Sequence, residues 1–80
     1  MERERILAII NSVLIKNKHV AITDDDISLR DAGFRSLDFS EVALRIEAEI
    51  DRELTFEAST MRRIASIKDA VDFFSRATSA

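Results

Sequence analysis

Residues 36–51 decide the fold of this chain, and they read SLDFSEVALRIEAEID. Apolar residues recur there at spacings of three and four, which places them on one face of an α-helix. That face, the core stripe, consists of Phe39, Val42, Ala43, Ile46 and Ile50. A second, narrower row consists of Leu37, Glu41, Leu44 and Ala48, and we expect it at the edge of the core or facing outward. The pattern predicts a helix from Ser36 to about Asp51 with one buried stripe.

Two further stretches show the same periodicity. The first carries Ile6, Ile9, Ile10, Val13 and Leu14, and it predicts a helix from about Glu2 to Asn17. The last carries Ile67, Ala70, Val71 and Phe74. Ser66 stands where it can cap this last helix, and Asp69 completes a variant of the capping box. We expect the tail from Arg76 to Ala80 to fray.

The segments between these helices lack a sustained period. Residues 18–35 predict a long loop with room for one helical turn, which is typical of functional or mobile segments. The connector from Arg52 to Ser59 has Leu54 and Phe56 as anchors, and a short helix is predicted from Thr60 to Ile64. Because Pro is absent and there is one Gly, tight sheet turns are disfavoured. The sequence therefore predicts an all-α bundle of three long helices and one short one.

Composition limits what the protein does. Its 80 residues suffice for one domain, 1–80, and the absence of Cys excludes disulfides, thiolate metal sites and a cysteine nucleophile. The net charge of −3 argues against nucleic acid as a ligand. No apolar run approaches the ~20 residues of a membrane span, and the charged N-terminus does not resemble a signal peptide. We expect a cytoplasmic monomer without a membrane span.

The negative charge is concentrated on the predicted central helix. Residues 36–53 hold six acids and two bases, a balance of −4, whereas the rest of the chain holds ten bases and nine acids, a balance of +1. One interpretation is a solvated helix face with pairs such as Glu41–Arg45 and Arg45–Glu49. The other is a docking surface for basic partner proteins.

The residues before this helix, DAGFRSLD at 31–38, place Ser36 at its start, after the chain-breaking Gly33. Backbone N–H groups at a helix start lack partners, and the macrodipole adds positive charge there. Both effects favour a phosphate ester on Ser36. The alternative is that Ser36 is only an N-cap, and position alone favours this alternative.

A family resemblance adds to this reading. GFRSLD, residues 33–38, resembles the Gly-x-Asp-Ser-Leu prosthetic-group motif of acyl carrier proteins. Residues 36–50 are similar to the acidic second helix of that family, and residues 64–74 resemble its final helix and the preceding turn. Helix order, loop length and total length agree as well, so the resemblance covers nearly the whole chain.

The resemblance implies a four-helix acyl-carrier-type bundle in which Ser36 carries a 4′-phosphopantetheine arm taken from coenzyme A. The arm's thiol would hold acyl groups as thioesters, which fits a chain without Cys. A phosphopantetheinyl transferase would then modify Ser36. The cargo would be handled by acyl-loading and acyl-transferring enzymes of fatty-acid, polyketide or lipid-modification biosynthesis. The protein itself would not be an enzyme. The partner-facing residues implied are Arg35, Leu37, Asp38, Glu41, Leu44, Glu47 and Ala48. Helix seams would part to shelter the acyl chain, and these are lined by Phe39, Val42, Ile46, Leu54, Ile64 and Val71.

One position departs from the family pattern, because Arg35 stands where the motif usually has Asp. Arginine cannot cap the helix, and it changes the charge beside the phosphate from −1 to +1. One expectation is that its guanidinium pairs with a phosphodiester, and the alternative is that it disturbs recognition by a general transferase or by common fatty-acid enzymes. We therefore expect a specialised carrier.

Other functions stay open but have less support. One is an unmodified helical interaction module of the same fold; another is a helix-turn-helix DNA binder, which the acidic helix disfavours. An enzyme is least expected, because no paired acid and base are evident. Asp24, Asp26 and Ser28 are spaced as in a calcium loop, but the required Gly is missing and Arg35 replaces the final Glu. His19 is expected to be solvent-exposed.

Overall fold

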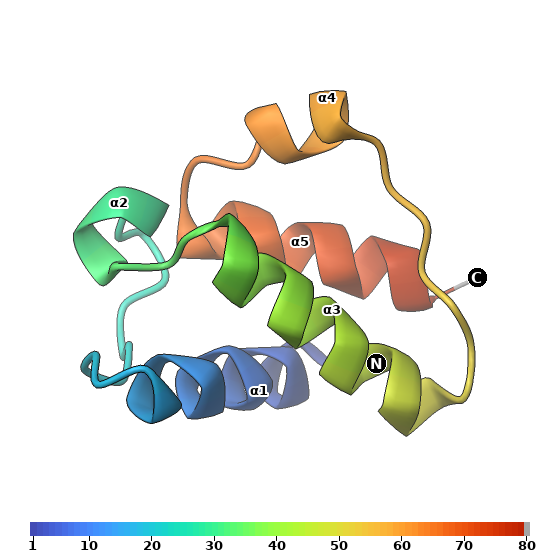
Figure 1. Ribbon diagram of the computed structural model, residues 1–80, viewed down its shortest axis with the longest axis horizontal. Helices are drawn as coiled ribbons and strands as arrows, with labels where there is room; N and C mark the ends of the chain where they lie inside the picture. Colours follow the sequence, from blue (N-terminus) through green and yellow to red (C-terminus); the bar gives the residue numbers. More distant parts are fainter. Residues whose placement is uncertain (80) are drawn as a thin grey trace.

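The computed structural model describes residues 1–79, which form an all-α domain (Figure 1). Its five helices are α1 (Arg3–Lys16), α2 (Leu29–Ala32), α3 (Ser36–Ile50), α4 (Ala58–Arg62) and α5 (Ile67–Thr78). These residues form no β-strand, and one isolated bridge pairs Ser28 with Ser66. The predicted all-α class is confirmed, and α2 is the one helical turn for which the loop of residues 18–35 had room.

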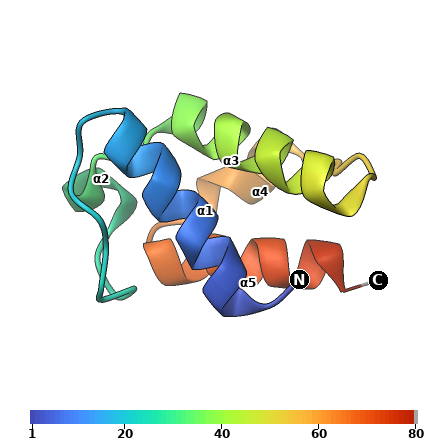
Figure 2. The ribbon, with the colours of Figure 1, turned by 90° about the horizontal axis from the view of Figure 1, so that it is seen from below.

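The three long helices bury their predicted stripes in one core. α1 packs against both α3 and α5, and in Figure 2 it lies in front of α5. The buried apolar residues of these helices are Ile6, Ile9, Ile10, Val13, Leu14, Phe39, Val42, Ala43, Ile46, Ile67, Ala70, Val71 and Phe74. Ile50, the last member of the α3 stripe, is half-buried. The helical periodicity thus identified the core face of every long helix.

Phe39 stands at the centre of an aromatic cluster. Its ring centroid lies 4.9 Å from that of Phe74, 5.3 Å from Phe56, 5.7 Å from Phe73 and 6.4 Å from Phe34. These contacts hold the connector before α4 against α3 and α5, as expected for Phe56 as an anchor. Such ring pairs contribute about 0.5–1.5 kcal/mol each beyond their buried area.

The long loop before α3 is fastened to the helices on both sides. The Asn11 side chain exchanges two hydrogen bonds with the backbone of Ile22, at 2.6 and 3.1 Å. The backbone N–H groups of Leu29 and Ile67 donate to the carbonyls of Ala65 and Ile27, at 2.9 and 3.0 Å. The loop is therefore tied to α1 and to the start of α5.

The capping box at the start of α5 forms as predicted. The Ser66 hydroxyl accepts from the Asp69 backbone N–H at 3.1 Å, and Asp69 Oδ2 accepts from the N–H of Ser66 at 3.2 Å. The same carboxylate oxygen accepts from the N–H of Ala65 at 3.1 Å. Hydrogen bonds from these two N–H groups, Ala65 first, hold the pKa of Asp69 below its ordinary value.

Two local predictions are wrong. The short helix α4 begins at Ala58, two residues before the predicted Thr60, and ends at Arg62. The tail does not fray from Arg76, because α5 continues to Thr78; Ala80 lies outside the described residues.

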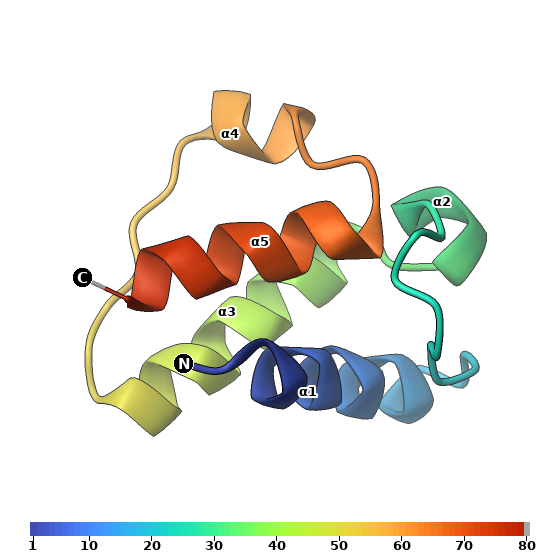
Figure 3. The same cartoon turned by 180° about the vertical axis from the view of Figure 1, so that it is seen from behind.

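The end of α5 is held by its neighbours. Thr78 Oγ1 donates to the Phe74 carbonyl at 2.7 Å and accepts from the Met1 ammonium at 3.2 Å. Arg52 Nη2 donates to the Ala77 carbonyl at 3.1 Å, and Figure 3 shows the end of α5 beside the connector that contains Arg52. Among residues 1–79, no helix is both long and apolar enough to cross a membrane.

Candidate functional site

Ser36 is the first residue of α3, and Arg35 occupies the N-cap position before it. The interpretation of Ser36 as a simple N-cap is therefore wrong. Its side chain is exposed, and its hydroxyl makes no hydrogen bond within residues 1–79. The oxygen has no structural partner to lose on modification.

Asp38, in the first turn of α3, caps the start of the helix with its side chain. Its Oδ2 accepts from the Arg35 backbone N–H at 2.8 Å, and its Oδ1 accepts from the Asn17 side chain. The guanidinium of Arg35 has no acceptor atom and caps nothing, as expected. Asp38 is only 7 % exposed. It therefore fixes the helix start, and its expected place on the partner-facing surface is wrong.

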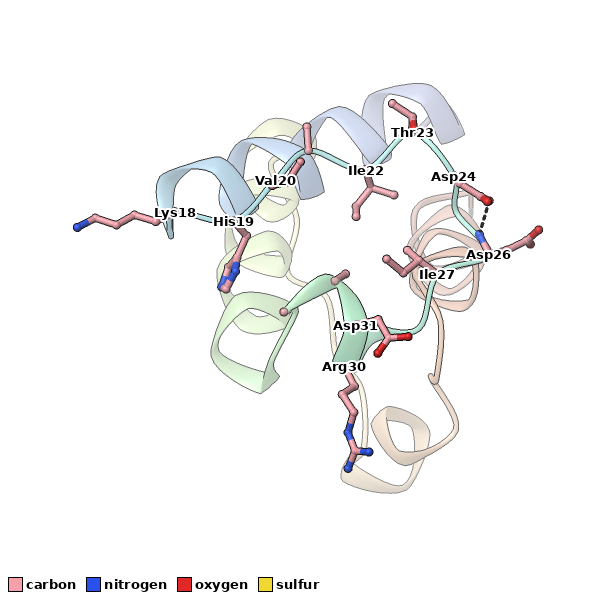
Figure 4. Close-up of a pocket in the computed structure, with 13 residues that line it drawn as sticks. Lys18, His19, Val20, Ile22, Thr23, Asp24, Asp26, Ile27, Arg30 and Asp31 are labelled. Carbon is pink, nitrogen blue, oxygen red and sulfur yellow. Dashed lines mark hydrogen bonds between the residues drawn. The ribbon is translucent and has the colours of Figure 1, made fainter.

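The turn before α3 needs glycine for two reasons. Gly33 ends α2 with φ of 76°, in the left-handed region that glycine adopts at no steric cost. A Cβ at this position would lie 2.7 Å from the Nδ1 and Cε1 atoms of His19. His19 is exposed, as predicted, and Figure 4 shows its ring directed towards α2. Sequence alone gave no signal for this contact.

A pocket of about 440 Å³ opens beside Ser36, between α2, the start of α3 and α4. Its floor is apolar and consists of Leu29, Phe34, Phe39, Met61 and Ile64. Three arginines, Arg30, Arg35 and Arg62, line it as well, and no acidic residue does. Of the seam residues expected to shelter an acyl chain, Phe39 and Ile64 line this pocket, whereas Val42, Ile46 and Val71 lie in the closed core.

The second row of α3 faces outward. Leu37 is 84 % exposed and Leu44 is 65 % exposed, and Ala48 is exposed as well. Glu41 is half-buried at the edge of the row. The alternative that Leu44 belongs to the half-buried core edge is thereby wrong. Isolated exposed leucines are common, but two on one row form an apolar surface available to a partner.

The acidic side chains of α3 are largely engaged within the fold. Glu41 Oε2 accepts from Lys16 Nζ at 2.9 Å and from Arg45 at 3.0 Å, which confirms the predicted Glu41–Arg45 pair. Glu49 pairs with Arg5 of α1 instead of Arg45, with Arg5 Nε at 3.0 Å. Hydrogen bonds from Lys16 and from Arg5 hold the pKa values of Glu41 and Glu49 below their ordinary value.

Glu47 is also committed, because its Oε2 accepts from the Leu54 backbone N–H at 2.7 Å. All four acids of α3 therefore have partners inside the domain. Their charge is tied to α1 and to the connector, which weakens the interpretation of α3 as an acidic docking face.

The loop before α2 brings three carboxylates together. Ligand atoms of Asp24, Asp25 and Asp26 lie within 4.8 Å of one another, and the Asp26 N–H donates to Asp24 Oδ1 at 3.0 Å. Ser28, the third residue of the calcium-loop comparison, instead caps α2 through the N–H of Asp31 at 3.0 Å. The group reads as an acidic turn.

The same loop walls a groove of about 750 Å³, formed by residues 18–33. In Figure 4, Ile22 and Ile27 point into this groove and Lys18 points away from it. The long-loop prediction carried no indication of the groove.

No protein-family model, curated protein sequence or solved structure matches this chain.

Proposed function

We propose that the protein is a specialised acyl carrier that holds acyl intermediates on a 4′-phosphopantetheine arm attached to Ser36. One observation carries the proposal: the Ser36 hydroxyl is exposed and unbonded at the first position of α3. The backbone N–H groups of that turn and the helix dipole favour a phosphate there. The motif resemblance of residues 33–38 names the group that such a serine carries.

The residues around Ser36 fit the group. Arg35 precedes the attachment point and offers planar guanidinium donors of the kind that recognise phosphate. The pocket beside Ser36 has an apolar floor, including Phe34 and Met61, that suits an aliphatic arm or the start of an acyl chain. The arm would supply the thiol that this chain lacks. The four-helix acyl-carrier architecture, with α2 as an extra turn in the loop, belongs to the same proposal.

The role needs no catalytic group on this chain. The Ser36 hydroxyl is the attachment point, and Asp38 and Gly33 hold the turn that presents it. A phosphopantetheinyl transferase and enzymes that load and transfer acyl groups are the partners. Arg35 in place of the family's Asp favours a dedicated set of such enzymes. We place the protein, as a monomer, in the cytoplasm.

An unmodified interaction module is the second candidate. It is supported by the outward-facing Leu37 and Leu44, which offer apolar contact whether or not Ser36 carries an arm.

Mass spectrometry separates the two candidates. The protein is incubated with coenzyme A and a panel of phosphopantetheinyl transferases, and we expect a mass gain of one arm. Ser36→Ala should show no gain, whereas Ser40→Ala, which removes an exposed serine one turn further along α3, should show the full gain. No gain with any transferase, and none in protein isolated from its source organism, favours the interaction module.

A further inference from the structure

Three arginines surround Ser36 without an acidic partner. Arg30, Arg35 and Arg62 are exposed and line the same pocket as Ser36. Within residues 1–79 their side chains make neither an ion pair nor a hydrogen bond. The ion pairs of the domain instead engage Arg3, Arg5, Lys16 and Arg45. Three of the bases outside these ion pairs therefore lie in one pocket beside Ser36.

Nearby acids do not offset this charge. Asp38 is buried and bonded to Asn17 and to the Arg35 backbone, and Glu41 is paired with two bases. Asp31 is exposed and lines the groove of residues 18–33 together with Arg30, but it does not line the pocket beside Ser36 and forms no ion pair with Arg30. In Figure 4 the guanidinium of Arg30 extends away from that groove. The surface beside Ser36 is thus basic, although the chain as a whole is acidic.

An apolar side chain accompanies these bases. Leu37 follows Ser36 directly and is 84 % exposed. Arg35 lies two residues before Leu37, and an exposed apolar residue near arginine matches the composition of protein–protein contacts, in which arginine is enriched. Protein partners also associate fastest when surfaces of opposite sign meet, and like charges brought together suppress binding.

We infer that the surface formed by Arg30, Arg35, Leu37 and Arg62 docks a partner protein whose contacting face is acidic around an apolar recess. This is the opposite of the basic partner expected from the acids of α3. The inference rests on the proposed function only in placing the partner's work at Ser36, because the charge of the surface does not depend on the arm.

The test uses two designed helical peptides with leucines on one face, one flanked by glutamates and the other by lysines at the same positions. Each is titrated into the isotope-labelled protein, and backbone amide shifts are followed by NMR. We expect the glutamate peptide to shift residues 30, 35–37 and 62, with affinity that falls as salt rises. The lysine peptide should leave these residues unchanged.

Charge reversal locates the effect. Arg30→Glu combined with Arg62→Glu should weaken binding of the glutamate peptide roughly tenfold, since exposed charge pairs contribute a few-fold each. The double variant Lys18→Glu/Lys68→Glu makes the same charge change at exposed sites outside this pocket and should bind as wild type. Circular dichroism confirms that each variant is folded.

The Ser36→Ala variant is titrated in parallel. If this variant binds the glutamate peptide as tightly as wild type, the docking surface does not depend on the arm. A failed modification experiment would then count against the proposed function and not against the docking surface. Three results would overturn the inference: the lysine peptide shifting residues 30, 35–37 and 62, the glutamate peptide leaving them unmoved, or a single-stranded oligonucleotide binding there more tightly than the glutamate peptide.

Discussion

Substitution of Gly33 by alanine should destabilise the domain through two separable effects. With φ at 76°, an alanine is forced into the left-handed region, which costs about 1 kcal/mol after the smaller entropy of the unfolded chain is subtracted. The new Cβ also lies 2.7 Å from two atoms of the His19 ring, so the ring must leave its position. Moving the exposed ring to another rotamer costs at most about 0.5 kcal/mol. The total is about 1.5 kcal/mol.

A double-mutant cycle with His19→Ala separates the two effects. Removing the ring relieves the clash but not the backbone strain, so Gly33→Ala should cost about 1 kcal/mol in that background. His19→Ala alone should change stability by less than about 0.5 kcal/mol, because the ring is exposed.

Urea unfolding followed by circular dichroism measures all four proteins. With a slope of about 1 kcal/mol per molar urea, the single variant Gly33→Ala should lower the midpoint by about 1.5 M. An equal cost of Gly33→Ala in both backgrounds would refute the contact with His19. No cost in either background would refute the left-handed turn.

Four other predictions follow from the same structure. Asp38→Ala removes a charged acceptor from the Arg35 N–H and should lower the free energy of unfolding by about 1.5–3 kcal/mol in urea titrations, whereas Glu53→Ala, at an exposed position, should change it by less than about 0.5 kcal/mol. Phe39→Ala opens the centre of the aromatic cluster and should cost about 3–5 kcal/mol; a cost near zero would contradict its burial. Leu37→Ala and Leu44→Ala should leave the unfolding midpoint within error, since both side chains face solvent, and a large loss would place them in the core. Asp69→Asn should lower the free energy of unfolding at neutral pH and much less in acid. Because the pKa of Asp69 is lowered in the folded protein, its carboxylate stabilises the fold above its ordinary pKa, and this stabilisation is lost as the pH falls through the lowered value. The unfolding midpoints of wild type and variant should therefore converge below the lowered pKa.

The long helices were predictable because their signals are local. Stripes at helical spacing located α1, α3 and α5, and the Ser66–Asp69 box marked the start of α5. The short helix α2 has no stripe, since one turn offers too few positions for periodicity, and its ends depend on Ser28 and Gly33. The order at the end of α5 depends on Met1 and Arg52, which are distant in sequence.

For the candidate site, the sequence indicated which residues lie at the start of α3 but not which charged side chains pair with one another. The helical wheel kept Leu37 and Leu44 out of the core stripe but left open whether they lie at the core edge or face outward, and both are exposed. Asp38 gave no sign of burial, because its partner Asn17 lies on another helix boundary, 21 residues away in sequence. Local spacing favoured Arg45 as the partner of Glu49, but Arg5 of α1 reaches that carboxylate instead.

Because of these long-range pairs, the net charge of a sequence segment does not give the charge that the same segment presents on the folded surface. Counted along the sequence, the segment of α3 is the most acidic part of the chain. In the folded domain, α1 supplies Arg5 and Lys16 to the acids of α3, whereas Arg30, Arg35 and Arg62 receive no carboxylate. A partner approaching Ser36 therefore meets the unpaired cations first, since interactions of exposed charges beyond about 10 Å are largely screened in physiological salt. The sign of the surface at the proposed attachment point follows from which helices pack together, and it is the reverse of the sign of the helix that begins there.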